Sequence, residues 1–149
     1  MSQNLTELSY LTFSVGQTEC AIELAAVQEL KVWEGVSKLP LASAYVLGAM
    51  NLRGEIVPVI DLLQRLEQRA AEIGPRAVVV LCRLKTGKIL GALVETVKDV
   101  RNLPSDCVKE IPEGLGYPTG LVRGLATLPG EILTVVDPEY LLEAQRELN

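Results

Sequence analysis

An internal repeat is the feature that most constrains how this chain folds. Residues 48–66 match residues 124–142 when the sequence is shifted by 76 positions. The matched pairs are Gly48 with Gly124, Leu52 with Leu128, Gly54 with Gly130, Glu55 with Glu131, Ile56 with Ile132, Val59 with Val135, Asp61 with Asp137 and Leu66 with Leu142. A shift of 70 also lays Leu11 on Leu81, Val27 on Val97 and Glu29 on Asp99. The chain therefore contains the same structural unit twice.

The repeat divides the sequence into two halves, about 8–74 and 75–149, each running strands, tight turn, strand and helix. A unit of about 70 residues has too little interior to be comfortably stable alone. With 48% apolar residues in 149, the chain has enough material for one sizeable core. We therefore predict a single domain, 1–149, in which two small β-barrel subdomains share a core.

Strands dominate the local patterns. Leu11, Phe13 and Val15 alternate with Thr12 and Ser14, which predicts a half-buried strand. Further strands are predicted near 20–22, 27–33, 49–52, 55–60, 76–84, 88–94, 95–100, 120–127 and 131–136. The three prolines and two glycines of 103–118 predict a loop. The fold class is mainly β.

Short helices complete the prediction. Asp61 stands at an N-cap position, and apolar residues at helical spacing follow until Gly74 and Pro75 stop the helix after about three turns. These apolar residues are Leu62, Leu63, Leu66, Ala70 and Ile73. A short helical piece is expected near 42–45, and a terminal helix from Asp137 through Leu148.

Charge and cysteine content exclude several functions. With 14 basic and 19 acidic residues the net charge is −5, which argues against binding nucleic acid or an anionic membrane. The longest apolar run, 77–82, is far shorter than the ~20 residues of a membrane span, so no direct membrane insertion is expected. Three cysteines without C-x-x-C spacing fit neither zinc nor a secreted disulfide framework, and a reducing cytoplasm fits best.

Catalytic signals are weak. The chain has no histidine, and Gly87-Lys88 lacks the other residues of a phosphate-binding loop. Glu95 and Asp99 could form a carboxylate pair, but charges flanking a strand are mostly solvated surface. We expect no catalytic residues, no metal ligands and no cofactor.

The most specific motif is G-A-M-N-L-R-G-E-I-V-P-V-I-D-L at 48–62. It strongly resembles the G-x-x-N-L-R-G-x-I-x-P-V-x-D-L signature of CheW-like adaptors in bacterial chemotaxis. The resemblance continues in 11–15, in I-E-L-A-A-V-Q-E-L at 22–30, in 91–100 and in 120–142. It covers nearly the whole chain.

The N-L-R-G turn can be analysed independently. Gly54 can take a positive φ at little cost, and Arg53 at the tip would point to solvent with a guanidinium able to pair with a carboxylate. Pro129 occupies the equivalent place, so we expect both halves to share the turn geometry. On sequence alone Arg53 would be a solvated turn residue. The resemblance implies instead that it lies near a receptor-binding face, with Glu29 as its partner.

The resemblance implies two intertwined five-stranded SH3-like barrels sharing a hydrophobic core, with a strand exchanged between the halves. It implies a non-enzymatic adaptor, a monomer in isolation, between the cytoplasmic tip of methyl-accepting chemoreceptors and the regulatory domain of a CheA-type histidine kinase. The candidate partner-binding residues are Arg53, Glu29, Val27, Leu24, Val46, Gly48 and Asn51. Two alternatives stay open: a PilI-like adaptor for twitching motility by type IV pili, and a small-ligand-binding β-barrel.

Overall fold

The computed structural model describes residues 7–40, 43–118 and 120–142, and within them the chain forms eleven strands and four short helices. The strands are β1 (Glu7–Val15), β2 (Thr18–Glu23), β3 (Val27–Val32), β4 (Val46–Leu52), β5 (Glu55–Asp61), β6 (Val78–Arg83), β7 (Ile89–Val94), β8 (Thr96–Pro104), β9 (Val108–Lys109), β10 (Val122–Leu128) and β11 (Glu131–Val136). The helices are α1 (Leu62–Glu67) and the 3₁₀ turns η1 (Leu24–Ala26), η2 (Ser105–Cys107) and η3 (Pro138–Tyr140).

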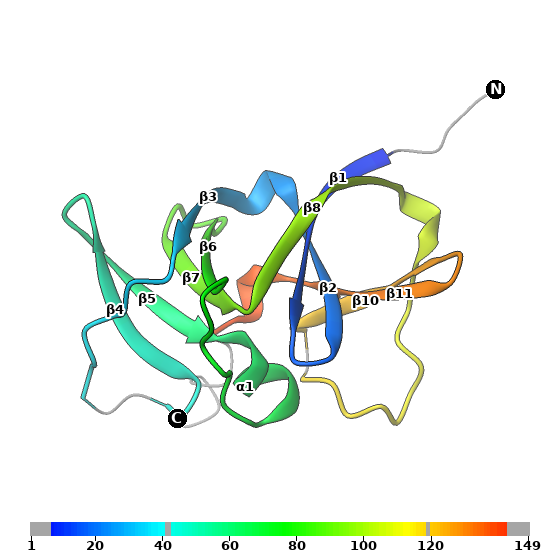
Figure 1. Ribbon diagram of the computed structural model, residues 1–149. Helices are drawn as coiled ribbons and strands as arrows, with labels where there is room; N and C mark the ends of the chain where they lie inside the picture. Colours follow the sequence, from blue (N-terminus) through cyan, green and yellow to red (C-terminus); the bar gives the residue numbers. More distant parts are fainter. Residues whose placement is uncertain (1–6, 41–42, 119, 143–149) are drawn as a thin grey trace.

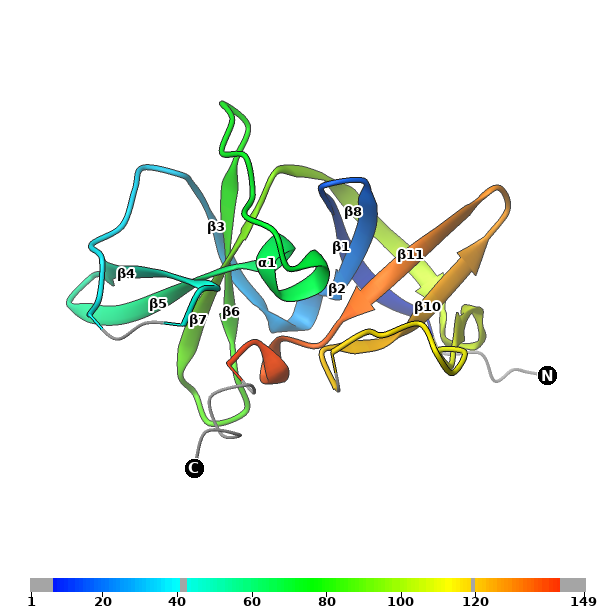
Figure 2. The ribbon, with the colours of Figure 1, turned by 90° about the horizontal axis from the view of Figure 1, so that it is seen from below.

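These strands form two sheets that lie side by side (Figure 1). One sheet has the order β8-β1-β2-β11-β10-β9 and the other has the order β3-β6-β7-β5-β4. We call the curled sheets barrel A and barrel B, respectively. The hairpins β10–β11 and β4–β5 extend toward opposite ends of the molecule (Figure 2). The predicted fold class, mainly β with two intertwined SH3-like barrels and short helices, is confirmed, with six strands in one sheet.

Each barrel takes strands from both halves of the sequence. Barrel A combines the β1–β2 hairpin with β8 to β11, and barrel B combines β6 and β7 with β3 to β5. The chain changes barrel at η1, between β2 and β3, and again between β7 and β8. As a result β3 pairs antiparallel with β6, and β8 pairs antiparallel with β1.

The repeat found in the sequence is a repeat of structure. The β4–β5 hairpin, when moved forward by 76 residues, falls on β10–β11, with a difference of one residue at the last strand end. The backbone N–H of Asp61 donates to the carbonyl oxygen of Tyr45 at 2.7 Å, and the equivalent N–H of Asp137 donates to Leu121 at 2.8 Å. Each hairpin therefore ends in the same way.

Two equivalent glycines allow a close backbone approach in both barrels. A Cβ atom on Gly48 would lie 2.2 Å from the carbonyl oxygen of Ser37, and one on Gly124 would lie 2.6 Å from that of Lys109. Lys109 belongs to β9, which pairs with β10, whereas Ser37 makes a single β-bridge to Ala49 of β4. The edge of β4 is consequently less fully covered than the edge of β10.

Three hydrophobic clusters hold the molecule together. The largest lies between the barrels and includes Phe13, Ile22, Ile60, Leu63 and Val136, from both sheets and from α1. A second cluster lies within barrel B and a third within barrel A. The two barrels therefore share a core, to which both sheets and α1 contribute.

Helix α1 is much shorter than the three turns predicted. The Asp61 carboxylate caps it as expected, accepting from the backbone N–H of Gln64 at 3.2 Å. Its second oxygen accepts from the N–H of Ala71 at 2.9 Å, which holds the following segment beside the start of the helix. Gln68 then ends the helix in a left-handed conformation with φ +60°.

Three further predictions of local structure need comment. Part of the loop expected over 103–118 is regular, because β8 continues to Pro104 and η2 and β9 follow. Residues 43–45 form a turn rather than a helix, and 41–42 lie outside the described residues. The terminal helix begins only as η3, and the rest of its expected length, 143–148, also lies outside them.

Candidate partner-binding site

The turn between β4 and β5 places Arg53 at an exposed tip. Arg53 has φ +49° and Gly54 has φ +91°, the two positive values that define a type I′ hairpin turn. The side-chain oxygen of Asn51 accepts from the N–H of Gly54 at 2.7 Å and so stabilises the turn. Positive φ is costly for a residue with a Cβ atom, so Arg53 occupies a strained position.

The equivalent turn in barrel A has a different geometry. Proline fixes φ near about −65°, so Pro129 cannot adopt the conformation of Arg53. With Gly130 at φ +76°, the Pro129-Gly130 pair fits a type II turn instead. The expectation that both halves share the turn geometry is therefore wrong, because it overlooked the positive φ at residue 53.

Arg53 forms an ion pair with Glu29 of β3. An Nη atom of Arg53 lies 2.6 Å from Oε1 of Glu29, while the Arg53 side chain stays 66% exposed. This hydrogen bond, and secondarily the charges of Arg53 and Lys31, hold the pKa of Glu29 below its ordinary value. The pair that the family resemblance implies is thus present.

The ion pair ties the hairpin tip to β3 across the open edge of barrel B. Barrel A has a counterpart of opposite polarity: Arg101 of β8 lies 2.9 Å from Glu131 at the start of β11. We call β3 and β8, the strands that follow the two changes of barrel, the crossing strands. In each barrel a charged side chain on the crossing strand therefore holds the tip of the hairpin. Only in barrel B does the tip itself carry the cation.

The apolar residues predicted for the site are partly covered by the protein itself. Leu24, Val27 and Val46 are half-buried and pack against the core that the barrels share. Val46 begins β4, whereas Arg53 follows its last residue, so roughly 20 Å of strand separates them. The structure does not bring Val46 into one groove with Arg53.

Gly48 and Asn51 have clear structural roles. Gly48 is buried and permits the close approach of Ser37, and Asn51 holds the turn through its bond to Gly54. Their direct contact with a partner stays a prediction.

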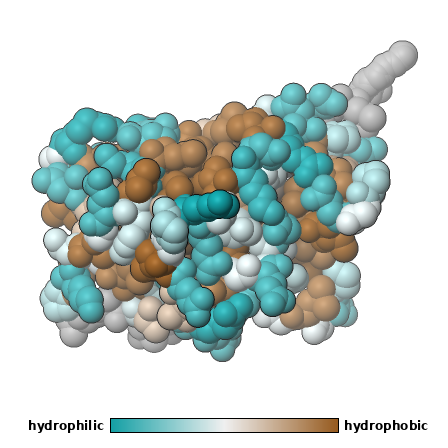
Figure 3. Space-filling view, viewed as in Figure 1, coloured by the Kyte–Doolittle hydropathy of each residue, from teal (hydrophilic) through white to brown (hydrophobic). Residues whose placement is uncertain are grey.

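Sequence reasoning missed three exposed apolar residues on the crossing strands. Leu30 and Val32 of β3 and Val100 of β8 are 43%, 68% and 52% exposed. Figure 1 places β3 and β8 on the upper face, and in Figure 3 apolar surface covers the upper middle of this view. The shift of 70 relates Leu30 to Val100, so the repeat gives them equivalent positions, but it does not show that they are exposed.

In residues 7–40, 43–118 and 120–142 there is no cluster of three or more side chains suited to metal binding. Nor do these residues include a helix with the length and apolar character needed to cross a membrane.

Comparison with known proteins identifies the family. A model described as the CheW-like domain matches residues 9–146. The chain belongs to the CheW-like family. It is 30% identical to a chemotaxis protein CheW from Rhizobium meliloti, over 91% of this chain and 87% of the relative. It is also 30% identical to a chemotaxis protein CheW from Klebsiella aerogenes, over 91% and 82%.

A solved structure supports the same fold. The crystal structure of the scaffolding protein TtCheW from Thermoanaerobacter tengcongensis superposes with a TM-score of 0.85 and 22% sequence identity, over 93% of this chain and 94% of that chain. Family membership and the relatives give the chain an adaptor, or scaffolding, role in chemotaxis. Their names favour this role over a twitching-motility adaptor and over a ligand-binding barrel.

Proposed function

We propose that this chain links the cytoplasmic tips of chemoreceptors to the regulatory domain of a CheA-type histidine kinase, and that it does so without catalysing a reaction. The observation that carries the proposal is the Glu29–Arg53 ion pair, which holds an exposed cation on a strained turn against one face of β3, while Leu30 and Val32 are exposed on the opposite face of this strand. Strain of this kind often marks a functional position.

The upper face fits the helices of a receptor tip. Helices dock on protein surfaces mainly through apolar side chains in a groove. Leu30, Val32 and Val100 offer such contacts from both crossing strands, and half-buried Leu24 and Val27 lie at and just after the crossing at η1. Arg53 uses one Nη atom for Glu29, which leaves other guanidinium donors for a receptor carboxylate or carbonyl. Apolar contact then supplies most of the affinity, and Arg53 sets the orientation.

The two hairpin ends fit contacts with the kinase. Ile56 at the start of β5 is 77% exposed, and its repeat counterpart Ile132 is 58% exposed. The hairpins lie at opposite ends of the molecule (Figure 2). The family resemblance implies that the kinase's regulatory domain is itself CheW-like. Ile56 and Ile132 are therefore proposed as kinase contacts, separate from the receptor face.

Replacing Arg53 tests the receptor face. In co-sedimentation with receptor-containing membranes, Arg53→Glu should lose most of the bound protein, because it reverses the charge at the tip and repels Glu29. Arg76→Glu is the matched control, since Arg76 is exposed and the charge change is the same. Both variants should melt near the wild-type temperature, as exposed substitutions usually do. Normal sedimentation of a folded Arg53→Glu variant would remove Arg53 from the site.

Replacing Ile56 tests the kinase contact. Ile56→Glu should weaken capture of a CheA-type kinase at least about tenfold, because a carboxylate would have to be buried in an apolar interface. The same variant should still co-sediment with receptor membranes. Equal loss of both partners would show that the two surfaces are not separate.

A further inference from the structure

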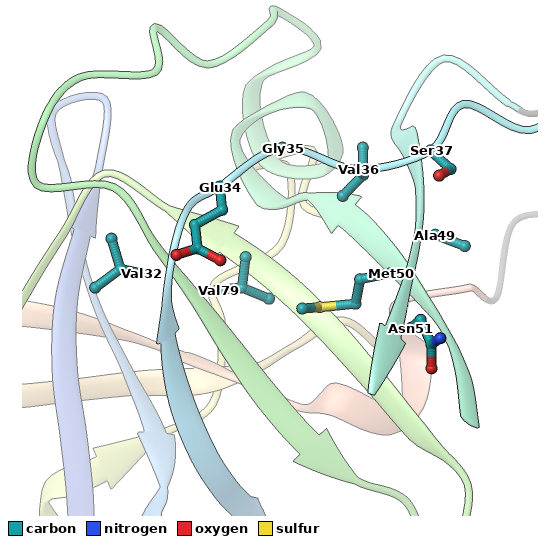
Figure 4. A pocket seen from close by; sticks show the side chains of 9 residues that line it. All are labelled: Val32, Glu34, Gly35, Val36, Ser37, Ala49, Met50, Asn51 and Val79. Carbon is teal, nitrogen blue, oxygen red and sulfur yellow. The ribbon is translucent and has the colours of Figure 1, made fainter. Parts of the chain in front are cut away.

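Barrel B has a pocket at its open edge. It is an open depression of about 430 Å³ between the end of β3, the segment 34–37 and β4. Figure 4 shows its lining side chains, with Val79 of β6 behind the opening. The single bridge between Ser37 and Ala49 closes one end of the edge.

The lining surface of the pocket is largely polar, with the apolar side chains of Met50 and Val79 and one carboxylate. The side chains of Met50 and Glu34 point toward Val79 from opposite sides (Figure 4). Val79 is buried and Met50 is half-buried, both belonging to the cluster within barrel B. Glu34 is exposed, and it makes no ion pair or side-chain hydrogen bond with any of the described residues.

Glu29, the other acidic residue near this edge, already has a cationic partner. It is paired with Arg53 and is influenced by Lys31. Glu34 is therefore the carboxylate that the pocket offers to a ligand. The aliphatic side chain of Val79 and the thioether of Met50 line the same pocket.

Barrel A does not reproduce this arrangement. The shift of 70 relates Glu34 to Pro104, which carries no charge, and Trp33 to Leu103, which is buried. There the edge of β10 pairs with the two residues of β9 rather than with a single bridge. The pocket with its carboxylate is thus a property of barrel B.

We propose that this pocket binds the side chain of an arginine or lysine presented by a partner protein. The methylene groups of such a side chain would pack on Met50 and Val79, and its cation would pair with Glu34. Long basic side chains commonly combine an apolar contact along the stem with a polar contact at the head. The proposal does not depend on receptor docking, because it concerns a side-chain site that the free protein can be tested for.

The probe is n-butylguanidinium, which reproduces an arginine side chain, with n-butylurea as a neutral counterpart of similar shape. Each is titrated into ¹⁵N-labelled full-length protein, and amide chemical shifts are followed. The expected result is saturable binding of the cation with shifts at residues 34–37, 49–51 and 79, and binding of the urea at least about twofold weaker. Glu34→Gln should weaken binding of the cation about threefold. Glu113→Gln, a charge-matched change at another exposed carboxylate, should leave it unchanged.

Several results would overturn the proposal. These are linear, non-saturable shifts, equal binding of the cation and the urea, or an equal loss of affinity in the two glutamine variants. Receptor co-sedimentation is measured on Glu34→Gln in parallel. Loss of n-butylguanidinium binding with normal co-sedimentation would confirm the pocket independently of the receptor face.

Discussion

The presence of an arginine at position 53 is explained by what its side chain does and not by the backbone conformation of the turn. A type I′ turn forms at least as well with glycine or asparagine at this position, since both adopt positive φ at lower cost. The bond from Gly54 to Asn51 and the ion pair with Glu29 hold Arg53 in place. A guanidinium kept at the tip against this preference is the residue-scale basis for proposing a binding role.

The ion pair between Arg53 and Glu29 leads to a prediction about the pKa of Glu29. In Arg53→Ala, the pKa of Glu29 should rise toward its ordinary value, because the hydrogen bond that lowers it is gone. In the wild type this lowered pKa stabilises the folded state above the ordinary pKa of glutamate, and the contribution is lost as the pH falls through the folded value. NMR titration of the Glu29 side-chain carboxyl carbon measures the pKa of Glu29 in the wild type and in Arg53→Ala. An unchanged pKa would mean that the pair does not persist in solution.

At this scale the sequence predicted part of the site. The N-L-R-G motif located the exposed Arg53, and the family resemblance supplied Glu29. The exposure of Leu30, Val32 and Val100 could not be predicted, because alternation shows that a strand has two faces but not which face stays uncovered. Glu34 was missed for a similar reason, since its pocket depends on backbone segments that are distant in sequence.

Among the elements, the two repeated hairpins were the most predictable. Their apolar patterns, turn glycines and terminal aspartates are local signals, and these placed β4, β5, β10 and β11 closely. The pairing of β3 with β6 and of β8 with β1 is not a local property, and only the resemblance implied an exchange. Helix α1 was overestimated because the bond from Ala71 to Asp61 has no signature in the helical spacing.

The short helix predicts unequal effects of two leucine substitutions. Leu62 is 1% exposed and Leu66 only half-buried, although both lie on α1. Leu62→Ala should cost ~2–5 kcal/mol, the usual range for a buried leucine, and Leu66→Ala clearly less. Urea unfolding of both variants measures the difference. Equal losses would mean that Leu66 is buried as completely as Leu62.

For the whole molecule, the shared core should make the two barrels one cooperative unit. Residues of both sheets meet in the central cluster, and α1 is joined to η3 by Arg65. The Arg65 guanidinium lies 5.0 Å from the centre of the Tyr45 ring and donates to the carbonyl oxygen of Tyr140 at 2.9 Å. Neither barrel should unfold separately.

The cysteines report on this cooperativity. Cys20 and Cys82 lie in the central cluster, and burial raises the pKa of both thiols, that of Cys82 to about 12. Cys107 is only half-buried. An alkylating reagent should therefore modify Cys107 first, and then Cys20 and Cys82 together at the rate of global unfolding. Mass spectrometry follows the adducts, and separate rates for Cys20 and Cys82 would indicate that the barrels open independently.

The central claim is that one molecule binds receptor and kinase at the same time through different surfaces. The most direct measurement is sedimentation of a CheA-type kinase with receptor-containing membranes, with and without this chain. We expect the kinase to reach the pellet only when the chain is present. With the Arg53→Glu variant, both the variant and the kinase should be missing from the pellet. With the Ile56→Glu variant, the variant should still sediment with the membranes, but the kinase should not. Kinase that sediments equally without the chain, or that stays soluble when the chain itself sediments, would contradict the account.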